Sequence, residues 1–335
     1  MLVSLIDNYS QLKRKQSKCF YERKSFMKKY QKVTSALVLL ASLLLITACS
    51  SNNKETAKKE SRILTDQLDH KVEIPNKPKR VIGSYLEDYL VALGEKPVAQ
   101  WTVGGGSRQD YLSEDLKDIP LINYDLPYED VLSYDPDLLL IESNGLVEGG
   151  KYEKYAKIAP TYVVKNGEKV TWQAKLTDIA NVLNKQKKGE EVINDYDKLV
   201  AETKKNYIKK IEDKSIAVLW VTNNSAFMVA DTRSSGDLLY QQLGFKVPDL
   251  TKEISEKSTS DWSAVSLEKL AQINCDYLIL VNSDQGAAMF KDSLWQNIPA
   301  VKNGNLWEFG PEKSWLYNGP IAYREMIEDI KSKLK

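Results

Sequence analysis

The side chains in this sequence that could do chemistry suit ligand binding better than catalysis. The 335 residues include one histidine, His70, and three cysteines, so acid–base chemistry would rest on carboxylates, and no paired set of carboxylates stands out. A zinc or manganese site would need several imidazoles, and a haem site an axial ligand. We interpret His70, in the segment LDHKVEIP, as a turn residue of an edge hairpin. No G-x-S-x-G, Walker A or post-strand G-x-G-x-x-G motif occurs in the sequence. We therefore expect a binding protein that is not an enzyme, carries no cofactor and gives no ligand to a metal.

Aromatic residues and arginines near predicted strand ends are the best candidates for such binding. Ligands of open α/β sheets lie beyond the carboxyl ends of the strands, so residues that follow a strand are favoured. The candidates on this ground are Tyr85, Trp101, Arg108, Asn144, Trp220 and Phe227. Trp101 precedes the glycine-rich segment TVGGGSR, in which the backbone could approach a ligand closely. Packing roles stay open for Trp101 and Trp220, and Arg108 could equally be a solvated loop charge.

Two pairs of similar segments indicate the elements that position these residues. Segments 128–144 and 267–283 each contain a short helical stretch with a glutamate, then an aspartate and an apolar run that is typical of a buried parallel strand. Segments 80–101 and 216–247 share the order strand, helix, Leu-Gly-x-Lys and strand, and the glycine of this motif fits a helix C-cap. The repetition predicts two α/β lobes.

An amphipathic helix is predicted between the two lobes. Trp172, Leu176 and Ile179 recur at helical spacing, and Gly189 interrupts the pattern before a second amphipathic stretch. The expected fold class is α/β, with two Rossmann-like lobes, one long α-helix joining them and a ligand cleft between them. The expected boundaries are 62–168 for the N-terminal lobe, 169–188 for the interlobe helix and 189–335 for the C-terminal lobe. Because one helix crosses once, we expect a stiff hinge and small lobe motion.

The first part of the sequence has the features of an export signal. An apolar run of about thirteen residues, 36–48, is shorter than the roughly twenty that span a bilayer, and it follows the basic stretch MKKYQK. Ile46-Thr47-Ala48-Cys49 resembles a bacterial lipobox, so we expect cleavage before Cys49 and lipidation of its thiol. Residues 1–48 are assigned to a leader and lipoprotein signal peptide, with Met1 or Met27 as the start, and 49–61 to a lipidated polar tether.

Charge and cysteine content after the predicted cleavage site narrow the possible partners. Nine of the 47 Lys and Arg residues but only two of the 46 Asp and Glu residues precede Cys49, which leaves a net charge of about −6. A chain of this charge is a poor candidate for nucleic-acid binding, which selects basic patches. Downstream of Cys49 the sequence has a single further thiol, Cys275, so the fold must depend on its core rather than on a disulfide.

The order of several segments resembles that of a known family. The lipobox, HKVEIPNKPKRVIG, DPDLLLI, APTYVV, WSAVSLEKL and LWQNIPAVKNGNLWEF occur in the order found in the substrate-binding lipoproteins of bacterial iron(III)-siderophore ABC importers. The resemblance implies a monomeric receptor, lipid-anchored on the extracytoplasmic face of a Gram-positive cell membrane. It would capture a ferric siderophore and deliver it to ABC permease and ATPase subunits. The alternative is a haem or cobalamin receptor of the same fold, and an α/β enzyme is more distant.

The resemblance adds residues to the predicted ligand site. Arg233, in ADTRSSGD, aligns with a family position that contacts the ligand. The turn KSWLYNGP places Trp315 and Tyr317 where hydroxamate-binding relatives carry aromatic residues, although a shift of one residue would put Leu316 there. The tryptophans expected in the core instead are Trp262, Trp295 and Trp307.

The resemblance also implies a docking role, and the arginine content indicates a ligand class. Family members meet arginine pockets of the permease through one surface glutamate per lobe, which implies Glu129 and Glu268 here. The alternative for both is an acid favoured by the helix dipole. A citrate-type or catecholate complex would require a cluster of arginines, whereas few arginines follow Cys49, so we expect a near-neutral hydroxamate complex.

Overall fold

Short parallel strands, buried on both faces, form the sheet of the N-terminal lobe. The computed structural model of the protein describes residues 61–104 and 106–335. Strands β3 (Val81–Gly83), β6 (Leu138–Ile141) and β7 (Thr161–Val163) pair in the order β3-β6-β7, and β4 (Gln100–Thr102) pairs with β5 (Leu121–Asn123). A bridge between Ile82 and Ala99 connects the two sets. The antiparallel hairpin of β1 (Ser61–Thr65) and β2 (Lys71–Pro75) precedes them. The helices of this lobe are α2 (Glu87–Ala92), η1 (Asp110–Leu112), α3 (Tyr128–Ser133), η2 (Asn144–Val147) and α4 (Lys151–Ala156).

The C-terminal lobe has one five-stranded sheet in the order β10-β9-β8-β11-β12. Its strands are β8 (Ile216–Thr222), β9 (Ser225–Val229), β10 (Trp262–Val265), β11 (Tyr277–Asn282) and β12 (Leu306–Phe309). Strands β8, β11 and β12 run parallel, whereas β9 is antiparallel to both of its neighbours. The helices of this lobe are α7 (Ser234–Gly236), the π-helix η3 (Asp237–Leu243), α8 (Asp249–Ser255), α9 (Leu267–Leu270), η4 (Ala288–Lys291), α10 (Ser293–Gln296), α11 (Pro299–Lys302), η5 (Ser314–Leu316) and α12 (Pro320–Leu334).

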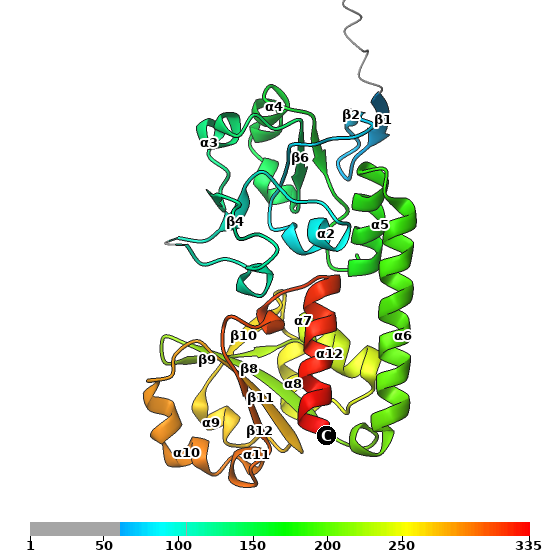
Figure 1. Cartoon of the computed structure of the whole chain (residues 1–335). Helices are drawn as coiled ribbons and strands as arrows, with labels where there is room; N and C mark the ends of the chain where they lie inside the picture. The colour runs from blue at the N-terminus through cyan, green and yellow to red at the C-terminus, as the bar shows by residue number, and fades with distance from the viewer. Residues whose placement is uncertain (1–60, 105) are drawn as a thin grey trace, which may run out of the picture. The chain divides into compact units, whose positions relative to one another are not determined.

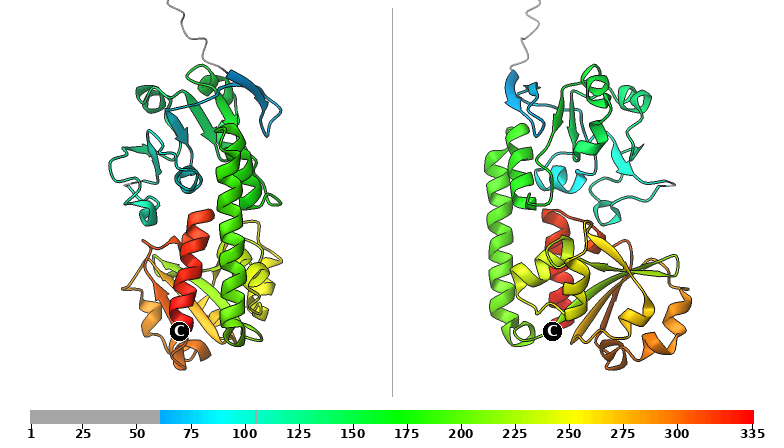
Figure 2. Two further views of the ribbon diagram at one scale, coloured as in Figure 1. Left: turned by 45° about the vertical axis from the view of Figure 1, so that its right-hand side comes forward. Right: turned by 180° about the vertical axis from the view of Figure 1, so that it is seen from behind.

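One long helix runs beside both lobes (Figures 1 and 2). It is α6 (Gln186–Ile211), 26 residues long, and it packs on α5 (Trp172–Val182) at one end and on η3 and α12 further along. The α/β class with two lobes and a single long linking helix is thereby confirmed. The segment 169–188, expected to be that helix, instead holds α5 and only the start of α6.

The expected boundary differs because Gly189 lies inside α6 and does not break it. A Cβ at this position would stand 2.9 Å from the Cβ of Ala180 on α5, so the glycine allows the two helices to approach closely. The chain reverses between them at Asn184, whose φ is 58°. The break therefore falls a few residues earlier than the glycine.

Three apolar clusters form the core of the described residues, and the largest joins the two lobes. It runs from Leu90 and Leu140 of the N-terminal lobe, through Tyr196 of α6, to Ile279 and Tyr323 of the C-terminal lobe. The second lies on the other face of the C-terminal sheet, and the third on the other face of the N-terminal sheet. Trp295 and Trp307 are buried, as predicted. Sharing one core through α5, α6 and α12 resists separation of the lobes.

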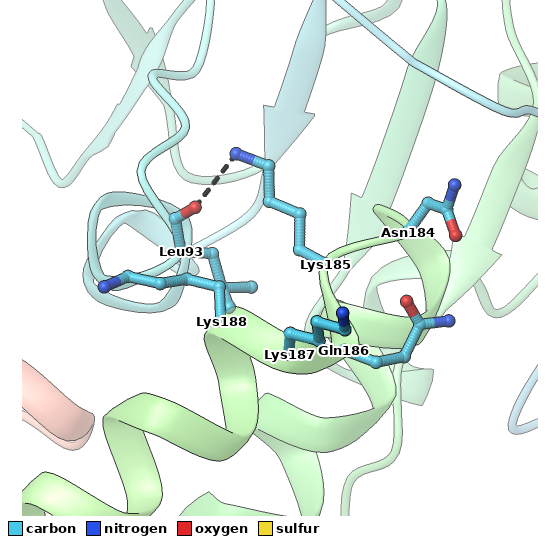
Figure 3. Close-up of a pocket in the computed structure, with 6 residues that line it drawn as sticks. All are labelled: Leu93, Asn184, Lys185, Gln186, Lys187 and Lys188. Atoms are coloured by element: carbon cyan, nitrogen blue, oxygen red, sulfur yellow. Dashed lines mark hydrogen bonds between the residues drawn. The ribbon is translucent and has the colours of Figure 1, made fainter.

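Lys185, at the start of α6, fastens the linking helices to α2 (Figure 3). Its Nζ donates to the carbonyl of Leu93 at 2.9 Å and forms an ion pair with Glu95 at 2.5 Å. A cation at the C-terminus of a helix can donate to a free carbonyl, and it interacts favourably with the negative end of the helix dipole. A shallow hollow at this junction is lined by Leu93 and by residues 184–188. The amine of Lys185 in this hollow is therefore already paired with groups of the protein.

None of the helices in residues 61–104 and 106–335 combines the length and the hydrophobicity that crossing a bilayer requires.

Candidate ligand-binding site

Four aromatic rings from both lobes lie together, and we call Tyr85, Trp101, Tyr111 and Tyr317 the aromatic cluster. The ring centroids of Tyr85 and Trp101 are 4.4 Å apart, and those of Tyr111 and Tyr317 are 5.2 Å apart. Tyr317, from the C-terminal lobe, is 6.1 Å from Tyr85 and donates its hydroxyl to the backbone carbonyl of Arg108 at 2.8 Å. All four rings are half-buried. The cluster is therefore a partly open apolar surface assembled across the lobe boundary.

The backbone positions Tyr85 at the carboxyl end of β3. Its φ of 57° lies in the left-handed region and turns the chain from the strand into α2. Burial raises the pKa of its hydroxyl well above the ordinary value, and burial also raises the pKa of Tyr317 to about 12. Both phenols thus stay protonated at physiological pH. The hydroxyl of Tyr317 donates to Arg108, whereas that of Tyr85 can donate to an anionic oxygen.

A polar cavity of about 450 Å³ is lined by side chains of both lobes. From the N-terminal side come Glu142, Ser143, Asn166, Glu168, Lys169 and Lys175, and from the C-terminal side Arg233, Ser234, Asp237, Asp261, Asn318 and Tyr323. Since Asn318 directly follows Tyr317, the cavity and the aromatic cluster are neighbours along the same turn.

Arg233 joins the two sides of this cavity. Its guanidinium forms an ion pair with Glu168 at 2.7 Å and a longer one with Asp261 at 3.9 Å. Asp261 also accepts a hydrogen bond from the side chain of Asn318 at 3.1 Å. The fork of donors on Arg233 is thus held at the cavity by carboxylates that a ligand oxygen could replace.

The start of α7 next to Arg233 contains polar groups that the protein leaves unpaired. Ser234 has a φ of 48°, and the hydroxyls of Ser234 and Ser235 are buried without a hydrogen-bond partner. Gly236 follows, and a Cβ there would stand 2.0 Å from the carbonyl oxygen of Ala230. This close approach to the end of β9 fixes where the chain carries Arg233.

A second aromatic group lies on the C-terminal sheet. Trp220 on β8 faces Phe227 on β9 at 5.3 Å and Trp262 on β10 at 6.1 Å, and its Nε1 donates to the hydroxyl of Ser283 at 3.0 Å. Trp220, Phe227 and Trp262 are all half-buried. Trp262, predicted to lie in the core, is only half-buried and packs against the margin of the largest apolar cluster.

Trp315 needs a second correction, because it lies in the core and not at the cleft. Its side chain is fully buried, stacks on Phe309 at 5.3 Å and donates its Nε1 to Asp329 at 3.1 Å. Trp315 lies inside the turn η5, whereas Tyr317 follows the turn with an extended backbone and reaches the N-terminal lobe.

Two other predicted residues are occupied by local contacts. The guanidinium of Arg108 pairs with Asp110 at 3.2 Å, and it is the carbonyl of Arg108 that meets the aromatic cluster. Asn144 accepts a hydrogen bond at 2.9 Å from Asn166, which lines the cavity. Their roles as ligand residues stay predictions.

Sequence reasoning missed Tyr111, Glu168 and Asn318. The sequence does hold a signal for Asn318, because it directly follows Tyr317 in the turn KSWLYNGP. Nothing in the segment KNGEK distinguishes Glu168 from any solvated loop acid. The contacts of Tyr111 depend on tertiary structure alone.

The two predicted docking glutamates occupy equivalent places in their lobes. Glu129 lies in the first turn of α3 and Glu268 in the first turn of α9, and both are exposed. Hydrogen bonds to its own backbone N–H and to Ser266 lower the pKa of Glu268, so it is ionised at neutral pH.

Cys49, the predicted lipidation site, lies outside the described residues, as do the leader and most of the tether.

In the part of the chain that the structure describes, no group of three or more His, Cys, Asp and Glu side chains could hold a metal ion. His70 pairs with the buried Asp66 at 3.0 Å and stacks on Tyr152 at 3.6 Å. Cys275 is buried, which raises the pKa of its thiol to about 12 and keeps it in the unreactive protonated form.

Comparison with known proteins gives one family over most of the chain. The family model "Periplasmic binding protein" matches residues 84–312. The chain is 26% identical to the iron(3+)-hydroxamate-binding protein FhuD of Bacillus subtilis, over 91% of this chain and 98% of that protein. It is 29% identical to the probable siderophore-binding lipoprotein YfiY of the same species, with the same coverage. Staphylococcus aureus SirA, solved with staphyloferrin B, has a TM-score of 0.67 at 25% identity and covers 82% of this chain and 98% of its own.

Proposed function

This chain belongs to the periplasmic binding protein family, and on that premise we propose that it is a receptor that captures a ferric siderophore and delivers it to an ABC permease. The observation that carries the proposal is the cavity of about 450 Å³ lined by both lobes, next to an aromatic cluster that both lobes also build. The names of FhuD and YfiY support the same ligand class.

The side chains around the cavity suit an iron complex that is already saturated by its own chelator. A siderophore fills the six coordination positions of ferric iron, so its receptor needs apolar walls and hydrogen-bond donors instead of metal ligands. Tyr85 and Arg233 supply such donors, and Trp101 and Tyr317 supply flat apolar walls. The protein is on this view a binding protein without enzymatic activity, cofactor or metal ligand of its own.

The charges around the cavity favour a near-neutral hydroxamate complex. Its lining includes the acids Glu142, Glu168, Asp237 and Asp261 against the bases Lys169, Lys175 and Arg233. Two of these bases are paired with acids of the same lining: Lys175 with Glu142 at 2.8 Å, and Arg233 with Glu168. An anionic citrate-type complex would meet more carboxylate than free cation, which disfavours its burial.

The remaining parts of the proposal concern how the receptor is placed. Lipidation of Cys49 would hold it on the extracytoplasmic face of a Gram-positive membrane as a monomer, and Glu129 and Glu268 would orient it on a permease served by ATPase subunits. The exposure of both glutamates in the first turns of α3 and α9 supports this arrangement.

Titration of intrinsic tryptophan fluorescence tests the ligand class. We expect ferrioxamine B and ferrichrome to bind the purified chain from residue 61 onward with high affinity. Binding should quench its tryptophan fluorescence, because Trp101 lies in the aromatic cluster. Ferric citrate, ferric staphyloferrin B, haemin and cobalamin serve as competitors of other classes. Tight binding of citrate-type complexes alone would reject the hydroxamate assignment, and binding of haemin or cobalamin alone would replace the siderophore proposal.

A further inference from the structure

Asp88 of α2 is a buried carboxylate that crosses the lobe boundary. It is 1% exposed. Its Oδ1 accepts a hydrogen bond from the backbone N–H of Ile321 at 2.9 Å, and its Oδ2 accepts one from the N–H of Ala322 at 2.8 Å. The same Oδ2 accepts the hydroxyl of Tyr111 at 2.8 Å. One side chain of the N-terminal lobe thus contacts both a helix of the C-terminal lobe and a member of the aromatic cluster.

Helix α12 needs this contact because its own segment offers no cap. The helix begins at Pro320, which has no N–H, and no local side chain caps it. The amides of Ile321 and Ala322 are the first free donors, and buried donors without a partner are costly. A carboxylate at this end also suits the positive end of the helix dipole. Asp88 therefore serves as an N-cap supplied by the other lobe.

Gly319 allows the carboxylate to come this close. A Cβ at this position would lie 2.4 Å from both Cγ and Oδ1 of Asp88. The side chain of Asp88 would have to move away to make room, and this movement would break the cap. Figure 1 shows the start of α12, in red, next to α2. The fit between residues 88 and 319 is thus specific to a glycine.

The residues on either side of this cap are those of the candidate site. Tyr317 of the aromatic cluster and Asn318 of the cavity lie immediately before Gly319. Tyr323, which also lines the cavity, lies in the first turns of α12 and donates its hydroxyl to the carbonyl of Ser234 at 2.9 Å. Fixing the start of α12 therefore fixes three side chains that face the ligand site.

We propose that Asp88 is a positioning residue for ligand binding: it caps α12 across the lobe boundary, orients Tyr111, and so assembles the aromatic cluster and the cavity edge without facing the ligand itself. The inference rests on the proposed function, since the ligand that it helps to bind is the ferric siderophore.

The test compares Asp88→Ala with Asp88→Asn and with a control, Asp66→Ala. Asp66 is also a buried acid that accepts backbone hydrogen bonds, from Leu68, His70 and Val163, but all of these are in the N-terminal lobe. The affinity for ferrioxamine B should fall about fivefold or more in Asp88→Ala, by analogy with the loss of a helix cap. It should fall less in Asp88→Asn, whose carbonyl can still accept one backbone bond. Asp66→Ala should lower the melting temperature and leave the affinity unchanged.

A double-mutant cycle with Tyr317→Ala separates positioning from general stability. If Asp88 acts through the turn before α12, adding Asp88→Ala to Tyr317→Ala should cost much less affinity than it does in the wild type. Full additivity, or a lowered melting temperature with unchanged affinity for Asp88→Ala alone, would overturn the proposal.

Amide hydrogen exchange decides the same question without a ligand. The amides of Ile321 and Ala322 should exchange faster in Asp88→Ala than in the wild type or in Asp66→Ala. Unchanged protection would reject the capping role even if the chain bound ferrioxamine B. Conversely, failure of the wild type to bind any siderophore would reject the proposed function, while the exchange result would still decide the role of Asp88.

Discussion

Arg233 offers hydrogen-bond donors to a ligand in the cavity, and carboxylates of both lobes hold its guanidinium in place. Its guanidinium donates a hydrogen bond to Glu168 of one lobe and lies 3.9 Å from Asp261 of the other, so a ligand can use its remaining donors or replace Glu168. Glu168 is largely exposed, and an exposed ion pair contributes little stability. The exchange of partners is therefore cheap for the protein, whereas the hydrogen bonds offered to iron-bound oxygens are charge-assisted.

Replacing Arg233 by alanine should weaken binding much more than it weakens the fold. We expect the affinity for ferrioxamine B to fall about tenfold or more, since a hydrogen bond to a charged group contributes about 1.5–3 kcal/mol. Fluorescence titration measures the affinity, and chemical denaturation measures the stability. Arg233→Lys is the matched control, because it keeps the charge but loses the fork. Equal affinities for all three proteins would contradict a role of Arg233 in binding.

Substitutions at Trp315 and Tyr317 should have different effects, although the two residues are close in the sequence. The first should lower mainly the stability and the second mainly the affinity for the ligand. Trp315→Ala should lower the free energy of unfolding by about 3–5 kcal/mol, because it removes a fully buried ring and leaves Asp329 without the Nε1–H donor. Tyr317→Ala should cost about 1–2 kcal/mol of stability and reduce the affinity about fivefold. Urea denaturation together with ligand titration gives both numbers, and the reverse pattern would show that the assignment of the two residues is inverted.

Helix α2 places two adjacent carboxyl groups, Glu87 and Asp88, in the core of the molecule. Oε1 of Glu87 accepts the backbone N–H of Trp101 at 2.6 Å, and its buried Oε2 has no partner. Burial raises the pKa of each carboxyl, from 4.5 and 3.8, to about 7. The short helix thus links β4, α12 and the aromatic cluster through groups whose ionised form is disfavoured.

These two groups predict how stability depends on pH. Between about pH 4.5 and pH 7 the folded state binds more protons than the unfolded state, so the free energy of unfolding should decrease as the pH rises through this window. Acids with a lowered pKa, such as Asp276, act in the opposite direction but below this range. Denaturation at pH 5, 6, 7 and 8 measures the slope. Glu87→Gln should make it shallower, and an equal slope in wild type and variant would contradict the raised pKa of Glu87.

The sequence predicts the presence of helices and strands better than it predicts where they begin and end. The repeated segments correctly indicate two α/β lobes, yet Gly189, predicted to interrupt the helix, lies inside α6 and allows close packing on Ala180. The antiparallel β9 was not expected, although Asn223 and Asn224, with φ values of 47° and 53°, make the tight hairpin turn that such residues favour.

Side-chain contacts between the lobes could not be predicted in the same way. The cap between Asp88 and Ile321 joins positions 233 residues apart, and no local periodicity encodes it. Likewise, a turn as short as η5 gives no periodic signal for which of Trp315, Leu316 and Tyr317 points inward. Strand ends and turns limit where a site can lie and therefore indicate the aromatic and arginine candidates, but the partners of these side chains depend on tertiary contacts.

For the molecule as a whole, the placement of the two exposed glutamates predicts a loss of uptake without a loss of binding. Glu129→Arg combined with Glu268→Arg should abolish siderophore-dependent iron uptake by cells, because both anchors would repel the arginine pockets expected on the permease. The affinity of the purified protein should not change. Reversal of the exposed Asp130, which neighbours Glu129 on α3, is a matched control that should leave uptake intact. Normal uptake by the double variant would reject the docking role.

The apolar cluster that runs through Tyr196 bears on how the protein melts. If each half had its own separate interior, heating could produce two calorimetric peaks. Here the loss of packing in one half exposes side chains that hold the other, so we expect residues 61–335 to melt in one cooperative peak. Its calorimetric and van't Hoff enthalpies should agree, and bound siderophore should shift the whole peak upward.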